Sequence, residues 1–109
     1  MPKIALVVEN LSELEKSSAI NQVKTLTNLS IVEIKERVLD KIPLYQCTLY
    51  GTDHDEKCKM LRQWLQLAEN KKFKIRIYKI NVSDDFTLIN DVAPYEIDEE
   101  DLYALFEAK

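Results

Sequence analysis

Apolar residues recur at helical spacing between residues 19 and 42, and this pattern predicts two short amphipathic helices. Their apolar positions are Ile20, Val23 and Leu26 in the first helix, and Ile31, Ile34, Val38 and Ile42 in the second. Asn28 can adopt the left-handed conformation that ends a helix. Ser30, followed three residues later by Glu33, is a capping box that starts the next one. The sequence therefore predicts a tight joint over residues 27–30.

Three further segments, residues 3–9, 44–50 and 73–78, have the apolar pattern of β-strands. The first is apolar on both faces, which is typical of a central strand. The third alternates strictly, with Phe73, Ile75 and Ile77 pointing inward and Lys74, Arg76 and Tyr78 pointing outward. We expect this third strand to be half exposed.

Two more helix starts are predicted by capping residues. The first is the box formed by Ser12 and Glu15, and the second is formed either by Asp53 with Glu56 or by Thr52 with Asp55. The first of these helices would run on to Thr27. The second, the longest in the chain, would end near Asn70, because asparagine tolerates the left-handed C-terminal conformation. Its apolar face is wide, and we expect Trp64 on that face to lie in the core.

The resulting order is β-α-α-β-α-β, which predicts an α+β fold of two layers. A three-stranded antiparallel sheet would be covered by three helices, all within a domain formed by residues 1–80. The residues expected to share its core are Ile4, Leu6, Ile20, Val23, Ile34, Val38, Leu49, Leu61, Leu65 and Ile75.

The balance of charge changes after this predicted domain. Residues 1–80 have a net charge of +4, whereas residues 81–109 hold nine acidic residues and one basic residue, a net charge of −8. Asp98 with Asp101 can cap a short helix in this acidic extension, and the apolar residues of that helix are Leu102, Leu105 and Phe106. The extension is also too apolar for a plain solvating tail, because it contains Phe86, Leu88, Ile89, Val92 and Tyr95. We expect it to dock on the domain, with Leu102 and Phe106 in a groove and carboxylates near residues 71–79.

Composition narrows the classes of function. One glycine in 109 residues leaves no glycine-rich phosphate loop, which argues against nucleotide chemistry. No apolar run approaches the roughly 20 residues that span a bilayer, and the N-terminus has the pattern of a strand rather than of a signal peptide. A cytoplasmic location is therefore expected. Cys47 and Cys58 are too far apart for a redox or metal motif, so we expect two reduced, partly buried thiols and no cofactor.

His54 stands between two carboxylates, Asp53 and Asp55, and is the one place where a metal ion or a general acid could be imagined. Consecutive residues at a helix start point in different directions, however, and acidic residues are favoured there in any case. We therefore expect helix capping and a solvent-exposed His54, with no metal site.

Basic residues gather on and before the third strand, at Lys71, Lys72, Lys74, Arg76 and Lys79. This basic run allows three interpretations: a solvated edge strand protected by lysines, nucleic-acid binding with aromatic stacking, or contact with the acidic extension or a protein partner. The net charge of −4 and the acidic extension disfavour nucleic acid.

The helix pair, AINQVKTLTNLSIVEIKERV, resembles the helix-turn-helix of the C-terminal domain of the bacterial ribosomal stalk protein. The joint of that family reads Thr-Gly-Leu-Gly-Leu-Lys-Glu-Ala-Lys, and the matching residues here are Thr27, Leu29, Ile31, Glu33 and Lys35. The element order agrees, and the resemblance covers about residues 3–80. It implies a protein-binding surface, for a GTPase or a similar partner, formed by Lys16, Ile20, Lys24, Glu33 and Lys35.

The ClpS adaptor family shares the same fold and offers a weaker resemblance. Glu9 and Asn10 stand where that family carries an Asn-Asp pair, whereas its His-x-x-Gly element has no counterpart here. A protease adaptor is therefore a weaker alternative.

The preferred function is thus a small non-enzymatic protein-binding module. The main alternative is an acidic inhibitor or immunity protein that neutralises a cationic toxin or nuclease, because clustered carboxylates attract a basic partner. The residues that would carry this alternative are Asp91, Glu96, Asp98, Glu99, Glu100 and Asp101. An enzyme is disfavoured, because one histidine and no paired reactive groups leave little for catalysis.

Overall fold

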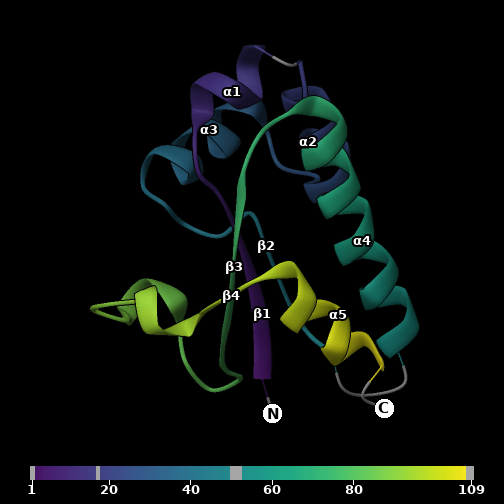
Figure 1. The fold of residues 1–109 in the computed structure, drawn as a ribbon. Coiled ribbons are helices and arrows are strands. Elements are labelled where there is room, and N and C mark those ends of the chain that lie inside the picture. The colour runs from purple at the N-terminus through teal and green to yellow at the C-terminus, as the bar shows by residue number, and fades with distance from the viewer. Residues whose placement is uncertain (1, 17, 50–52, 108–109) are drawn as a thin grey trace.

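The computed structural model describes residues 2–16, 18–49 and 53–107 as an α+β fold (Figure 1). The strands are β1 (Pro2–Val8), β2 (Tyr45–Thr48), β3 (Ile75–Asn81) and β4 (Glu96–Ile97). The α-helices are α1 (Leu11–Lys16), α2 (Ile20–Thr27), α3 (Ile31–Leu39), α4 (His54–Lys71) and α5 (Glu99–Glu107). Two short 3-10 helices, η1 (Phe86–Leu88) and η2 (Ala93–Tyr95), lie between β3 and β4.

The strands form one antiparallel sheet in the order β2-β1-β3-β4. β1 is central, as its two apolar faces predict. The predicted number of three strands is wrong, because Glu96 and Ile97 add a fourth by pairing with Tyr78 and Ile77. β3 is therefore an interior strand at these two residues, and the interpretation of its basic run as a solvated edge strand fails there.

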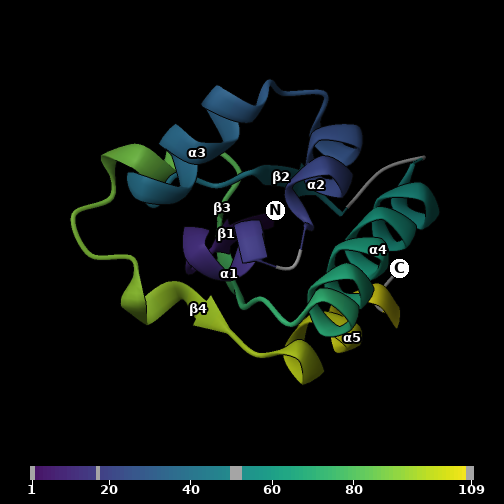
Figure 2. The same ribbon diagram turned by 90° about the horizontal axis from the view of Figure 1, so that it is seen from above.

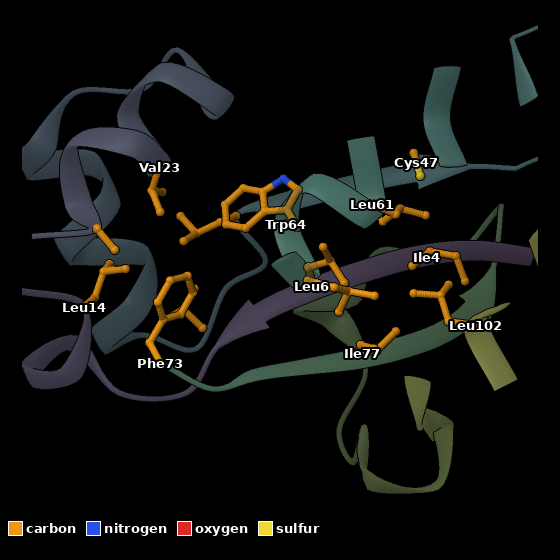
Figure 3. Close-up of a cluster of buried hydrophobic side chains, with 14 of the residues drawn as sticks. Ile4, Leu6, Leu14, Val23, Cys47, Leu61, Trp64, Phe73, Ile77 and Leu102 are labelled. Carbon is orange, nitrogen blue, oxygen red and sulfur yellow. The ribbon is translucent and has the colours of Figure 1, made fainter. Parts of the chain in front are cut away.

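The main core fills the space between one face of the sheet and the helices (Figure 3). Each helix contributes at least one fully buried side chain, namely Leu14, Val23, Ile34, Leu61 and Leu102 in the order α1 to α5. Trp64 is fully buried among them, as expected. Eight of the ten predicted core residues belong to this cluster, and the other two, Ile20 and Ile75, are partly buried and pack against it. Burial of these side chains is the main force that holds the two layers together.

A second, smaller apolar cluster covers the opposite face of the sheet. Ala5, Val7, Tyr78 and Ile80 are buried there beneath Phe86 of η1. The Tyr78 and Phe86 rings meet edge to face, with their centroids 5.1 Å apart. Tyr78 does point away from the main core, as predicted, but the expected exposure of this position is wrong, because the chain after β3 folds back over this face.

The joint between α2 and α3 has the predicted geometry. Asn28 has a left-handed φ of 60° and its backbone N–H donates to the carbonyl oxygen of Lys24 at 2.8 Å. The hydroxyl oxygen of Ser30 accepts from the backbone N–H of Glu33 at 3.2 Å and lies 3.2 Å from the Glu33 carboxylate. The left-handed backbone of Asn28 thus ends one helix and the side chain of Ser30 caps the next, as the sequence predicts.

The helix predicted from residue 12 to Thr27 is instead two helices, α1 and α2. Ser18 has a φ of 60°, and the backbone N–H groups of Ser18 and Ala19 donate to the carbonyls of Glu15 and Leu14. These bonds are the Schellman arrangement that closes a helix C-terminus. The break lets Leu14 and Val23 enter the core from separate helices.

The ends of α4 also differ from the prediction. The helix passes Asn70 and ends at Lys71, and Lys72 takes the left-handed φ of 57°. The N–H of Phe73 then donates to the carbonyl of Ala68, which lets the Phe73 side chain enter the core. At the other end, the side chain of Asp53 makes no capping hydrogen bond and pairs with Lys57 at 3.4 Å instead. The alternative cap, Thr52, lies outside the described residues.

The C-terminal segment, residues 82–107, contacts both faces of the sheet. It crosses the back face at Phe86, adds β4 to the sheet and then places α5 beside α4 (Figure 2). Leu102 and Phe106 of α5 are buried in the main core, and the guanidinium of Arg62 on α4 lies 4.9 Å from the centre of the Phe106 ring. Within the described residues, no helix is both long and apolar enough to cross a membrane.

Candidate functional site

The helix-pair surface, defined as Lys16, Ile20, Lys24, Glu33 and Lys35, is spread over α1, α2 and α3. Its four charged side chains are exposed, whereas Ile20 is half-buried and packs against the main core. Lys35 also makes an ion pair with Glu15 on α1, with 3.8 Å between the charged atoms. The structure therefore leaves this predicted surface accessible, with Ile20 contributing more to the core than to the surface.

An apolar stripe on α3 adjoins this surface and was absent from the sequence-based prediction. We call Val32, Lys35 and Leu39 the outer stripe, since their spacing of three and four residues places them on one helix face. Val32 and Leu39 are 65% and 68% exposed, although Ile34 and Val38 on the same helix are buried. The sequence did contain the signal, because Val32 and Leu39 lie opposite Ile34 and Val38 at helical periodicity.

One end of the outer stripe borders an open hollow between α1 and α3. Leu11, Val38 and Leu39 give the hollow its apolar side, and Glu15 and Lys41 lie at its rim. An apolar side chain of another molecule could contact Leu39 and the hollow at the same time.

A second hollow lies where β3 and β4 meet the facing ends of α4 and α5. Its apolar floor consists of Leu65, Ala68, Phe73 and Ile75. Carboxylates from five parts of the fold surround it and an adjoining hollow: Glu9, Glu69, Glu96, Asp98, Glu99 and Asp101. We call this continuous region the acidic groove. With Lys74 and Arg76 as its only cations among the described residues, its net charge is −4.

Four of the six predicted acidic residues line the acidic groove, namely Glu96, Asp98, Glu99 and Asp101. The other two lie elsewhere. The Asp91 carboxylate accepts from the backbone N–H of Ala93 at 3.1 Å, which supports the turn before η2. Glu100 is exposed on α5 and does not line the groove. The structure thus separates a group that the sequence could only treat as one cluster.

Arg76 joins two edges of the acidic groove through its guanidinium. It donates to the carboxylates of Glu9 and Glu96, both at 3.1 Å. The Glu9 carboxylate is the main cause that raises the pKa of Arg76 above its usual value. Of the basic run, Lys74 and Arg76 line the groove, which agrees with the predicted contact between this run and the acidic extension.

His54 is half-buried, so the prediction of a solvent-exposed histidine is wrong. Its Nε2 lies 3.0 Å from the carbonyl oxygen of Phe106, and its Nδ1 contacts the carbonyl oxygen of Leu49. The sulfur of Cys58 lies 3.5 Å from Nε2. The ring therefore links the start of α4 to the end of α5. Among residues 2–16, 18–49 and 53–107, no cluster of histidine, cysteine and carboxylate side chains could hold a metal ion.

The thiols of Cys47 and Cys58 are both buried, more deeply than the partial burial that was expected. Burial is the main cause that raises the pKa of Cys47 above its usual value, which disfavours the reactive thiolate. Neither cysteine is placed for chemistry at the surface.

The chain was compared with protein families, curated proteins and solved structures, and it matches none of them. The resemblance to the ribosomal stalk domain and the weaker one to ClpS therefore stay predictions.

Proposed function

We propose that this chain is a non-enzymatic protein-binding module that contacts its partner through α2 and α3, as the resemblance to the ribosomal stalk domain implies. The observation that supports this proposal is the outer stripe of α3. Val32 and Leu39 flank Lys35 on an exposed helix face whose opposite side is packed in the core. The module would act in the cytoplasm and bind a GTPase-like or other protein partner.

The geometry of the stripe explains how such binding would work. Single exposed apolar residues are common on protein surfaces and need no explanation. Two exposed aliphatic residues at helical spacing, beside a hollow with an apolar side, instead resemble the anchors of a helix that packs into the groove of a partner. Lys24 and Lys35 would then set orientation and association rate, since charges at the edge of an interface affect these more than affinity.

The test is capture of partners from a lysate of the source cells with the tagged full-length chain. Proteins retained by the wild type should be lost with the double variant Val32→Ser and Leu39→Ser. Leu88→Ser is the matched control, because Leu88 is 78% exposed and lies far along the chain from the helix pair. Each retained protein is then purified, and its affinity for the variants is measured directly.

The measured affinities show whether the partner binds at the outer stripe or elsewhere. Loss of affinity in the stripe variant, with Leu88→Ser unchanged, supports the module. The module is rejected if two variants both keep the wild-type affinity. These are the stripe variant and the double variant Lys24→Glu with Lys35→Glu.

A second candidate function, an acidic inhibitor or immunity protein, is supported by a different observation. The acidic groove has a net charge of −4 around an apolar floor, which suits a cationic protein such as a nuclease toxin. The same purified partner distinguishes the two candidates. Binding through the groove should weaken strongly with added salt and survive the stripe variant, because screening acts on charges and not on apolar anchors.

A further inference from the structure

We infer that the acidic groove is a docking site for an extended segment of another protein in which basic and apolar residues alternate. This inference rests on the second candidate function and names the part of the partner that would be bound. Three features of the groove support it: an open strand edge, an apolar floor and carboxylates without ion-pair partners.

The open strand edge belongs to β3. β4 pairs with β3 only at Ile77 and Tyr78, after which the chain turns into α5. The Lys74 carbonyl accepts from the N–H of Glu9 on the β1 side, so alternation directs the backbone groups of Ile75 to the opposite edge. No described strand pairs with Ile75 at that edge. An extended segment could therefore continue the sheet where β4 leaves it.

The apolar floor lies beside this edge. Ala68 and Ile75 are half-buried and form the accessible part of the floor, above the buried side chains of Leu65 and Phe73. Side chains of an extended segment alternate between two sides, so every second residue would face this floor. Those residues should be aliphatic.

The carboxylates select the remaining residues of the segment. Arg76 already neutralises Glu9 and Glu96 within the chain. Glu69, Glu99 and Asp101, by contrast, make no ion pair with any described residue. Glu69 of α4 and Glu99 of α5 line the hollow that contains the apolar floor, and Glu99 and Asp101 of α5 line the adjoining hollow. Lysine or arginine residues of the segment would meet them, as Arg76 meets its two carboxylates.

The groove exists only in the assembled fold. Glu69 comes from α4, Glu99 and Asp101 come from α5, and Ile75 comes from β3. Packing of Leu102 and Phe106 brings these elements together. A segment that binds in the groove would consequently recognise only the folded chain. A segment attracted by charge alone would also bind the acidic extension without the packing of Leu102 and Phe106.

The experiment uses the full-length chain and a labelled eight-residue peptide that alternates lysine and leucine, followed by fluorescence anisotropy. Two control peptides have the same composition with the lysines grouped at one end, or have glutamate in place of lysine. The alternating peptide should bind several-fold more tightly than the grouped one, and the glutamate peptide should not bind. Backbone amide resonances of Ile75, Ala68 and Glu99 should shift on binding.

Variants locate the binding site. Glu69→Gln and Glu99→Gln should each weaken the alternating peptide about two- to fivefold, the range expected for one exposed ion pair. Glu100→Gln is the matched control, because Glu100 lies beside Glu99 on α5 but outside the groove. Val32→Ser should also leave the affinity unchanged, so that failure of the helix-pair module and failure of this inference give different results.

Several results would overturn the inference. Equal affinity for the alternating and grouped peptides would indicate attraction by charge alone. Equal weakening by Glu99→Gln and Glu100→Gln would place the binding outside the groove. Concentration-dependent dimerisation that Glu69→Gln abolishes would make a second copy of this chain the occupant.

Discussion

The helix pair and the C-terminal segment obtain their structures in different ways. In the helix pair, residues 20–39, the joint is determined by neighbours within a few positions: Asn28 ends one helix and Ser30 caps the next. The C-terminal segment, residues 82–107, instead depends on contacts with residues far along the chain, such as Tyr78 beneath Phe86. The comparison teaches that local signals define a short helix, whereas a segment that wraps around a sheet depends on the sheet being present.

The largest expected effect comes from removing α5, which would show whether the rest of the fold is stable without this helix. A chain that ends at Ile97 loses both Leu102 and Phe106 from the core. Truncations of single buried residues of these types cost about 2–5 kcal/mol each, so the sum approaches the roughly 5–15 kcal/mol stability of a small protein. We expect the shortened chain to lose cooperative urea unfolding. Cooperative unfolding near the wild-type midpoint would make α5 an appendage.

Single core substitutions in the helix pair and in the C-terminal segment should lower the free energy of unfolding by similar amounts. Ile34→Ala in α3 and Leu102→Ala in α5 each remove a fully buried aliphatic side chain, so each should lower the free energy of unfolding by about 2–5 kcal/mol. Leu39→Ala and Leu88→Ala are exposed controls from the same two regions, and both should change it by less than about 0.5 kcal/mol. Urea denaturation provides the values. A wild-type midpoint for Leu102→Ala would show that α5 does not belong to the core.

The ion pairs of Arg76 should matter much less than these apolar contacts. Arg76→Gln removes two exposed ion pairs between β3 and the carboxylates of Glu9 and Glu96. Exposed pairs contribute little to stability, and salt screens them. We therefore expect a small loss of stability at low salt that shrinks at high salt. A loss as large as that of Leu102→Ala would mean that charge, not burial, holds the C-terminal segment in place.

The smallest expected effect concerns the two tyrosines on opposite faces of the sheet. Burial raises the pKa of Tyr45 and the pKa of Tyr78 above their usual value of 10.0. Phe86→Ala should expose Tyr78 and lower its pKa towards that value while the pKa of Tyr45 stays high. Tyrosinate absorbance is followed during an alkaline titration, and the same titration of Tyr45→Phe and Tyr78→Phe assigns each pKa. An unchanged pKa of Tyr78 would show that the C-terminal segment does not shield this face.

The same pKa shifts predict how stability depends on pH. Each tyrosine keeps its proton to a higher pH in the folded state than in the unfolded chain. The unfolded state is therefore the first to ionise, and the stabilisation is complete below about pH 10 and is lost as the pH rises further. Melting temperatures should fall in this alkaline range, and Phe86→Ala should reduce the part of the fall that Tyr78 causes.

Some parts of the candidate surfaces could be predicted and others could not. The exposed positions of Lys24, Glu33 and Lys35 followed from their place on the polar sides of two amphipathic helices. The acidic groove could not be predicted, because its carboxylates are up to 92 positions apart in the chain, from Glu9 to Asp101, and come together only after folding. His54 was wrongly expected to be exposed, since nothing near it in the chain indicates that the end of α5 packs against its ring.

Periodicity and capping in the sequence alone were enough for the α+β class, the central β1, the joint at Asn28 and Ser30, and eight of the ten predicted core residues. These features depend on residues within a turn or two, whose apolar spacing selects a face and whose side chains satisfy nearby backbone groups. Tertiary structure decided the fourth strand, the burial of Tyr78 and the assembly of the acidic groove. Each of these requires the C-terminal segment to pack against strands that are distant in the chain, and the free energy of that packing comes from the apolar surfaces that become buried.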